Sequence, residues 1–167
     1  RQSPNADLSG TKSSIDMFNN IAREASALSN QFFQDAATKA RRDGTTGGKN
    51  AMSMNPDGTI TAHSVPDAGE IFTQSFQDAQ NHAVKSATIN SMSEKLLDLS
   101  AGLQNDKNRT SSFEKDSTEI VNKFINTTDP SLQKEIELEG KLIQSKLARQ
   151  LTKIDLQEAK EQNRADV

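Results

Sequence analysis

Apolar residues recur along most of this chain at spacings of three and four, which places them on one face of an α-helix. The spacing predicts four amphipathic helices, over residues 13–42, 66–102, 111–126 and 130–163. We therefore predict a mainly α fold, an elongated helical bundle of about four amphipathic helices with one Gly/Pro-rich loop or small hairpin. Its expected parts are an extended lead-in at 1–12, a helical bundle domain at 13–163 with a loop at 43–66, and a polar tail at 164–167.

The first predicted helix carries a heptad seam of barely two repeats. Its members, separated by 3, 4, 3 and 4 residues, are Phe18, Ile21, Ala25, Leu28 and Phe32. Small residues beside the seam permit close approach of another helix. Core packing within one chain would produce the same spacing, so the seam predicts either an interior or a contact between copies.

Residues 43–66 are rich in Gly and Pro and interrupt the helical pattern. We expect the run Gly44–Gly48 to be flexible, and Asn55-Pro56-Asp57-Gly58 is a strong turn signal. The residues on either side of this turn alternate well enough for a small hairpin. The segment is either a plain surface connection between helices or a loop that faces a lumen or a partner.

The second helix has two apolar stripes that are out of phase near residues 84–88. The first runs through Phe72 and Phe76, and the second through Met92, Leu96 and Leu99. Such a slip changes the supercoil locally or passes the seam from one partner helix to another.

Local signals mark the starts of the last two helices. Ser111 and Glu114 have the spacing of a capping box, and Asp129 followed by Pro130 suits a cap and a first turn. Gly140 interrupts the stripe of the fourth helix, which predicts close approach of a facing helix. That stripe consists of Leu132, Ile136, Ile143, Leu147, Leu151 and Ile154, and Leu138 and Leu142 widen it on one side.

These stripes supply the candidate interface residues of the chain. They are Phe18, Ile21, Leu28, Phe32, Phe72, Phe76, Leu96, Leu99, Ile136, Ile143, Leu147, Leu151 and Ile154.

The composition favours assembly over a self-sufficient globule. Only 32% of the residues are hydrophobic and 4% aromatic, and the mean hydropathy is -0.75. Burial contributes roughly 25 cal/mol per Å² of apolar surface, whereas ordering costs roughly 1.5 kcal/mol per residue. We therefore expect part of the apolar surface to be buried against neighbouring chains. Disorder of the isolated chain is the alternative, and the net charge of -3 and the clear periodicity argue against it.

Several function classes find no support in the sequence. The balance of 20 basic and 23 acidic residues is not the footprint of a tight DNA-binding protein. A disulfide framework and a thiolate metal site are excluded because the chain has no Cys. No run of 18 apolar residues predicts a helix that spans a membrane unaided, and no charged leader with an apolar core predicts a secretory signal. Because the chain begins at Arg1, we expect a fragment, a processed product or the ordered part of something larger.

No catalytic constellation is recognisable. His63 and His82 lie about twenty residues apart, and neither has a second His at i+3 or i+4, so we expect both to be solvated. Carboxylate pairs such as Glu135 with Glu139 alternate with basic residues and predict surface ion pairs. Neither a phosphate-binding loop nor a nucleophile elbow is present. We therefore predict a protein that is not an enzyme and has no catalytic, cofactor-binding or metal site.

The order of several short motifs resembles a known family. The motifs are Ala40-Arg-Arg-Asp-Gly44, Asp57-Gly-Thr59, Glu70-Ile-Phe-Thr-Gln-Ser-Phe-Gln-Asp-Ala79, a Phe-bearing helix from Phe113 to Phe124, and Asp129-Pro-Ser-Leu-Gln-Lys-Glu-Ile136. Over residues 13–155 the chain is similar to the N-terminal parts of internal virion proteins, also called ejection proteins, of short-tailed bacteriophages. Related patterns occur in other phage tail and head–tail structural proteins.

The resemblance implies a structural role. Such a protein is stored in the virion, leaves ahead of the genome, and reassembles as a homo-oligomeric ring or tube across the bacterial cell envelope and periplasm. Its implied partners are other virion proteins of the portal, tail or core, and the assembled channel would pass DNA without sequence-specific binding. Members of the family are mostly far longer than this chain, which lacks a lytic transglycosylase signature. The family offers no catalytic residues to carry over.

Two other classes of protein fit the same helical pattern. One is a helical chaperone or adaptor module whose seams accept a partner's helix. The other is a filament-type or needle-type subunit of a secretion system or flagellum, which would also lack Cys and Trp.

Overall fold

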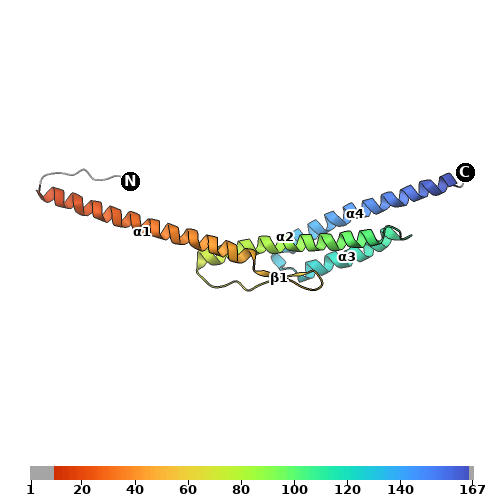
Figure 1. Ribbon diagram of the computed structural model, residues 1–167, viewed down its shortest axis with the longest axis horizontal. Coiled ribbons are helices and arrows are strands. Elements are labelled where there is room, and N and C mark those ends of the chain that lie inside the picture. Colours follow the sequence, from red (N-terminus) through yellow and green to blue (C-terminus); the bar gives the residue numbers. More distant parts are fainter. Residues whose placement is uncertain (1–9, 166–167) are drawn as a thin grey trace.

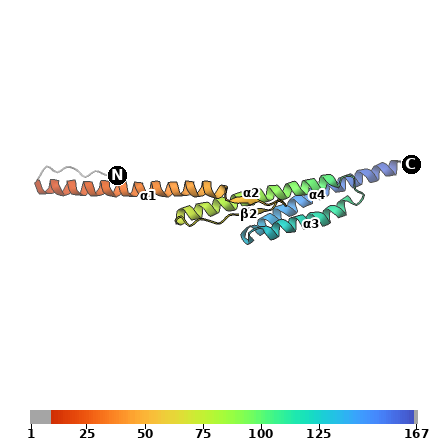
Figure 2. The same ribbon diagram turned by 60° about the horizontal axis from the view of Figure 1, so that its bottom comes forward.

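The protein is mainly α-helical, as predicted, and the computed structural model describes residues 10–165 (Figure 1). Its elements in chain order are α1 (Gly10–Lys49), β1 (Met52–Met54), β2 (Ile60–Ala62), α2 (Glu70–Gly102), α3 (Arg109–Thr127) and α4 (Pro130–Ala165). Figures 1 and 2 show an elongated molecule in which α1 extends from one end and the last turns of α4 extend from the other.

The hydrophobic core lies between α2, α3 and α4, which form an up-down-up bundle. Short connections join these helices, so consecutive helices run antiparallel. The largest fully buried apolar side chains come from all three: Met92, Leu96, Phe113, Phe124, Ile136 and Leu151. Because every helix contributes to one cluster, the three helices stabilise one another, as expected for amphipathic helices.

The last turns of α1 pack against the first turns of α2, and the prediction that Gly44–Gly48 form a flexible run is wrong. These residues are helical, and α1 ends only at Lys49. An added Cβ on Gly44 would lie 2.5 Å from the carbonyl oxygen of Phe72, and one on Gly48 would lie 2.2 Å from that of Phe76. The glycines are therefore needed for close approach of two helix backbones. Both contacts advance in the same direction along the two chains, so α1 and α2 run parallel where they cross.

A two-stranded antiparallel hairpin connects α1 to α2, as predicted. Met52 pairs with Ala62 and Met54 with Ile60, and the turn lies at Asn55–Gly58. The Gly58 amide donates to the Asn55 carbonyl at 2.9 Å, and Gly58 has a positive φ of 89° that favours glycine. The second strand runs back against the first, and an extended segment continues to the start of α2, so α2 can again run in the direction of α1 (Figure 1).

The buried stripe of α2 winds around the helix. All but one of its buried members recur at every fourth position, and these are Phe76, Gln80, Val84, Thr88, Met92, Leu96 and Ser100; the other is Ser91. A spacing of four exceeds the 3.6 residues of a turn, so each step rotates the stripe by about 40°. Consequently Phe76 meets α1, the Gln80 amide bonds to the hairpin, and Met92 meets Gly140 of α4. The predicted transfer of the seam between partners is confirmed, but it is a continuous winding through residues 84–88 and not a slip there.

Several predicted boundaries need correction. Residues 1–9 of the expected lead-in lie outside the described residues, and residues 10–12 are helical. The second helix begins at Glu70, after Pro66, because Gly69 has a positive φ of 91°. The expected tail is part of α4 as far as Ala165, and residues 166–167 lie outside the described residues.

Of the predictions for α3 and α4, the structure contradicts the cap of α3 and confirms the cap of α4 and the role of Gly140. The capping box is wrong: α3 begins at Arg109, and Ser111 donates to the Asn108 carbonyl from inside the first turn. Asp129 does cap α4, because its Oδ1 accepts from the Ser131 amide at 2.9 Å and from the Ser131 hydroxyl at 2.7 Å. The prediction for Gly140 is also confirmed, since an added Cβ would lie 2.9 Å from Val121 Cγ1.

Candidate functional site

The most distinctive surface feature is an open apolar groove of about 400 Å³ where α1 diverges from α2. Its lining comes from α1 and from the start of α2: Phe33, Ala36, Ala37, Ala40, Ala68, Gly69, Glu70, Ile71 and Phe72. Phe33 is 67% exposed and Ile71 is 40% exposed, although both are large apolar side chains. Small alanines form one wall, so the groove can accept an apolar side chain or the ridge of a helix.

The groove lies at the base of the α1 arm, defined here as residues 10–40. In Figures 1 and 2 no other described element lies alongside the first half of this arm. The apolar seam of the first predicted helix runs along the arm and continues toward the groove through Ala36 and Ala40 at every fourth position after Phe32. The sequence therefore predicts that the seam leads into the groove and that the two form one contact surface.

The candidate interface residues fall into three groups. Five are buried inside the chain and are interior residues: Leu96, Ile136, Leu147 and Leu151 in the core, and Phe76 at the crossing of α1 and α2. Four are half-buried: Leu99, Ile143 and Ile154 border the core, and Phe72 lines the groove between α1 and α2. The remaining four, Phe18, Ile21, Leu28 and Phe32, lie on α1, but their side chains are outside the described part of the structure. A partner could reach the first group only by opening the bundle, so these five serve the fold, and contacts between copies stay a prediction for the others.

Sequence reasoning missed most of the large apolar side chains that the fold leaves exposed. Besides Phe33 and Ile71, these are Met54, Leu97, Leu138, Leu142 and Leu156. Leu138 and Leu142 were recognised only as a widening of the stripe. A stripe at helical spacing shows which face of a helix is apolar. Leu97 and Leu156 lie outside any stripe, so the spacing does not indicate that they belong to an apolar face.

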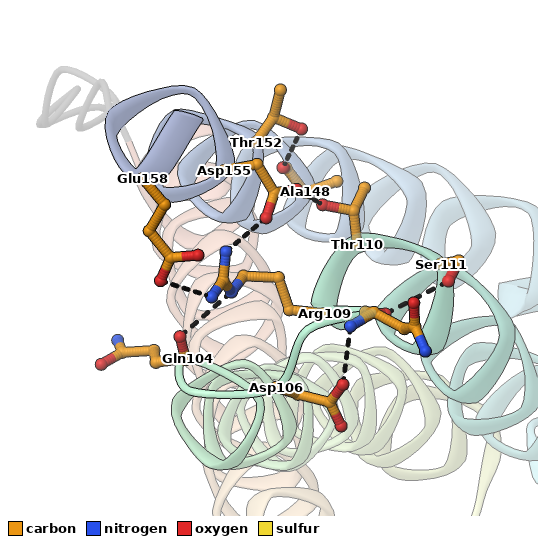
Figure 3. A network of polar contacts seen from close by, with 10 residues as sticks. Gln104, Asp106, Arg109, Thr110, Ser111, Ala148, Thr152, Asp155 and Glu158 are labelled. Atoms are coloured by element: carbon orange, nitrogen blue, oxygen red, sulfur yellow. Dashed lines mark hydrogen bonds and ion pairs between the residues drawn. The ribbon is translucent and has the colours of Figure 1, made fainter. Parts of the chain in front are cut away.

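A buried cation lies at the other end of the bundle. Arg109 is only 2% exposed, and Figure 3 shows its guanidinium between the α2–α3 link and α4. Its Nε donates to the Gln104 carbonyl at 3.0 Å, and its two terminal nitrogens contact Asp155 and Glu158. Because the partners are 46 and 49 residues further along the chain, no local motif reveals this site.

Hydrogen bonds and charge set the protonation of this cluster. The Thr110 hydroxyl, which donates to Asp155 Oδ2 at 2.7 Å, and then the Arg109 guanidinium hold the pKa of Asp155 below its ordinary value. The hydrogen bond to Glu158 raises the pKa of Arg109. The single positive charge of Arg109 faces two carboxylates, and all the partners of its guanidinium come from the same chain. The cluster therefore acts as a clamp that holds α4 to the start of α3.

The hairpin carries a second polar cluster. Asp57 accepts from the Thr59 hydroxyl at 2.6 Å and forms an ion pair with Lys123 of α3 at 3.1 Å. The hydrogen bonds from Thr59 and then Lys123 lower the pKa of Asp57. These contacts fix the hairpin tip to the bundle.

The two histidines are exposed, as expected of solvated side chains. His63 Nε2 contacts the Ser53 hydroxyl across the hairpin. A serine nucleophile needs a base that a third group orients, and within residues 10–165 no carboxylate contacts the His63 ring. Over the same residues, no three His, Asp or Glu side chains gather closely enough to hold a metal ion.

Comparison with known proteins gives no assignment: no family model, no curated protein and no solved structure matches this chain. Within the described residues, no helix has the length and apolar content to cross a membrane.

Proposed function

We propose that this chain is a structural subunit that assembles with copies of itself, and specifically an internal virion (ejection) protein of a short-tailed bacteriophage. The observation that carries the proposal is the α1 arm with the apolar groove at its base. The groove exposes Phe33 and Ile71 where a neighbouring molecule can reach them.

The arm is long compared with its contacts to the bundle. A helix of 40 residues is about 60 Å long at 1.5 Å per residue, and its backbone approaches that of α2 at Gly44 and Gly48, near its end. Helices without tertiary packing are marginal in water. A neighbouring subunit that lies along the arm would stabilise it, and the predicted seam from Phe18 to Phe32 supplies the apolar contact.

The phage role rests on the resemblance of the motifs between residues 40 and 136, and the fold is consistent with it. A subunit that threads a narrow tail has to unfold and refold readily. The single core is thin, the crossing between α1 and α2 depends on glycines, and the chain has no Cys to form a disulfide. Helices that open locally at low cost suit such a passage.

A helical adaptor is the second candidate, and the groove favours it. A partner's amphipathic helix can lay an apolar side chain between Phe33 and Ile71, which is a common mode of peptide recognition. The two candidates differ in what completes the groove: another copy of the chain, or a different protein.

The phage role is tested by locating the chain in infected cells. Antibodies against residues 70–165 should label the interior of purified phage particles before infection and the bacterial envelope fraction after genome release. A chain that is absent from purified particles but abundant in the cytoplasm during assembly would contradict the ejection role and favour the adaptor.

A further inference from the structure

The outer face of α4 combines exposed leucines with basic residues. Successive residues turn by about 100° around a helix, so Leu138, Leu142, Arg149 and Leu156 lie within about 40° of one another. All four side chains are exposed, and this face points away from the buried Ile136 and Leu147. We call it the α4 outer face.

The α4 outer face is basic because four of the six acidic side chains of the helix are engaged in ion pairs, and the other two, Glu139 and Glu161, lie about 100° and 140° around the helix from Leu138. Glu135 pairs with Lys85 at 2.9 Å, Glu137 pairs with Lys141 at 2.7 Å, and Asp155 and Glu158 hold Arg109. The cations that flank the leucines show no ion pair within residues 10–165, and they are Lys134, Arg149, Lys153 and Lys160.

The exposed side of α2 has the opposite charge. Glu94, Leu97, Asp98 and Ala101 are exposed there, around the side of the helix that faces away from Leu96. Leu97 is 51% exposed, and Glu94 and Asp98 lie about 60° and 100° from it on the same side around the helix. Lys95 lies on a different side, beside Gly58 of the hairpin. We call Glu94, Leu97, Asp98 and Ala101 the α2 outer face.

We propose that the α4 outer face of one copy docks on the α2 outer face of the next copy. This inference rests on the proposed function, since it names the surfaces through which the subunits assemble. Leucines of both faces come together, and the cations of α4 meet the carboxylates of α2, so charge and apolar surface are complementary between two different faces of one chain. Such a contact is heterologous, and repetition of it builds a ring if the rotation closes and a filament if it does not.

An anionic lipid surface would also attract a basic, leucine-bearing helix face. A second copy is the better occupant because the chain itself presents an exposed acidic face, the α2 outer face, whose charge complements that of the α4 outer face. A membrane would use the α4 outer face and leave the α2 outer face without a role.

Charge reversal tests the docking. Variant A carries Glu94→Lys with Asp98→Lys, and variant B carries Arg149→Glu with Lys153→Glu. In each variant alone the two outer faces have like charge, so the dissociation constant of self-assembly should rise more than about tenfold. An equal mixture of A and B, and the chain that carries all four changes, should assemble as the unaltered chain does, because every contact again joins opposite charges.

The readout is molar mass by light scattering at about 0.1 M salt, where surface charges act over about 10 Å. A matched control reverses two exposed residues of α3, Lys115→Glu with Glu119→Lys, and should leave the mass unchanged. Circular dichroism confirms that each variant is folded.

Three results would overturn the docking, and they are distinguishable. If A and B assemble as the unaltered chain does, these faces are not the contact, while self-assembly stands. If the unaltered chain is a monomer, both the docking and the assembly role fail. If the unaltered chain stays monomeric but sediments with phosphatidylserine vesicles, and variant B alone loses this binding, the basic face serves a membrane.

Discussion

Gly48 of α1 lies directly against the backbone of Phe76 in α2: a Cβ at Gly48 would stand 2.2 Å from the Phe76 carbonyl oxygen and 3.0 Å from Ala79 Cβ. No rotation of a side chain relieves a contact with a carbonyl oxygen. The angle at which the α1 arm leaves the bundle therefore depends on the lack of a side chain at Gly48. The groove beside the arm depends on the same angle.

Gly48→Ala should loosen the crossing between α1 and α2. Overpacking costs about 1–3 kcal/mol, which exceeds the gain of about 1 kcal/mol in helix propensity. Hydrogen exchange of the amides of residues 40–49 should speed up while those of α3 keep their protection. Gly102→Ala is the matched control, because no atom lies within 4 Å of its added Cβ, and it should raise stability by less than about 1 kcal/mol. Equal exchange in both variants would contradict the contact.

Gly140→Ala should destabilise the bundle core by about 1–3 kcal/mol, since the added methyl meets Val121 Cγ1 at 2.9 Å and Met92 Sδ at 3.1 Å. Val121→Ala opens space at the same place. In a double-mutant cycle by urea unfolding, the two changes together should cost less than the sum of the single changes. Strict additivity would show that α3 and α4 do not touch at this point.

Gln80→Met should detach the hairpin from α2 without unfolding the bundle. The buried Gln80 amide donates to the Ala51 carbonyl at 2.9 Å and to the His63 carbonyl at 2.7 Å. Loss of these bonds should cost about 1–3 kcal/mol, because the His63 carbonyl loses a donor, while the Ala51 carbonyl keeps the bond from the His63 amide. The signals of Met52–Ala62 in a nuclear magnetic resonance spectrum should broaden or shift. Gln77→Met, at an exposed position of the same helix, should leave them in place.

Asp129→Ala should lower stability by about 1 kcal/mol at neutral pH, the usual value of a lost helix cap. The Ser131 hydroxyl and then its amide lower the pKa of Asp129. A lowered pKa means that the stabilisation is complete above the unfolded value of about 3.9 and is lost as the pH falls through the folded value. The difference between variant and parent in urea unfolding should therefore shrink below about pH 4. Ser111→Ala, which removes the misassigned cap, should change stability by less than about 0.5 kcal/mol.

Glycine was the residue whose role depended most on tertiary context. Gly140 was interpreted correctly because it interrupts an apolar stripe inside an evident helix. Three glycines after a charged segment predict a flexible run at Gly44 and Gly48, and the structure contradicts this. Their spacing of four continues the positions of Phe32, Ala36 and Ala40, and this was the signal that would have extended the helix.

The candidate surfaces could be predicted only in part. Helical spacing found the stripes, but it does not distinguish a stripe that packs inside the chain, such as that of Ile136 and Leu147, from one that meets a partner. The groove depends on the angle between α1 and α2, and the Arg109 clamp on residues far apart in the chain. Both arise from tertiary structure, and no local pattern encodes them.

The central claim is that this chain assembles with copies of itself. Sedimentation velocity of the purified 18.2 kDa chain over a range of concentrations tests it most directly. We expect a species several times this mass that dissociates on dilution. A single 18.2 kDa species at every concentration would contradict it.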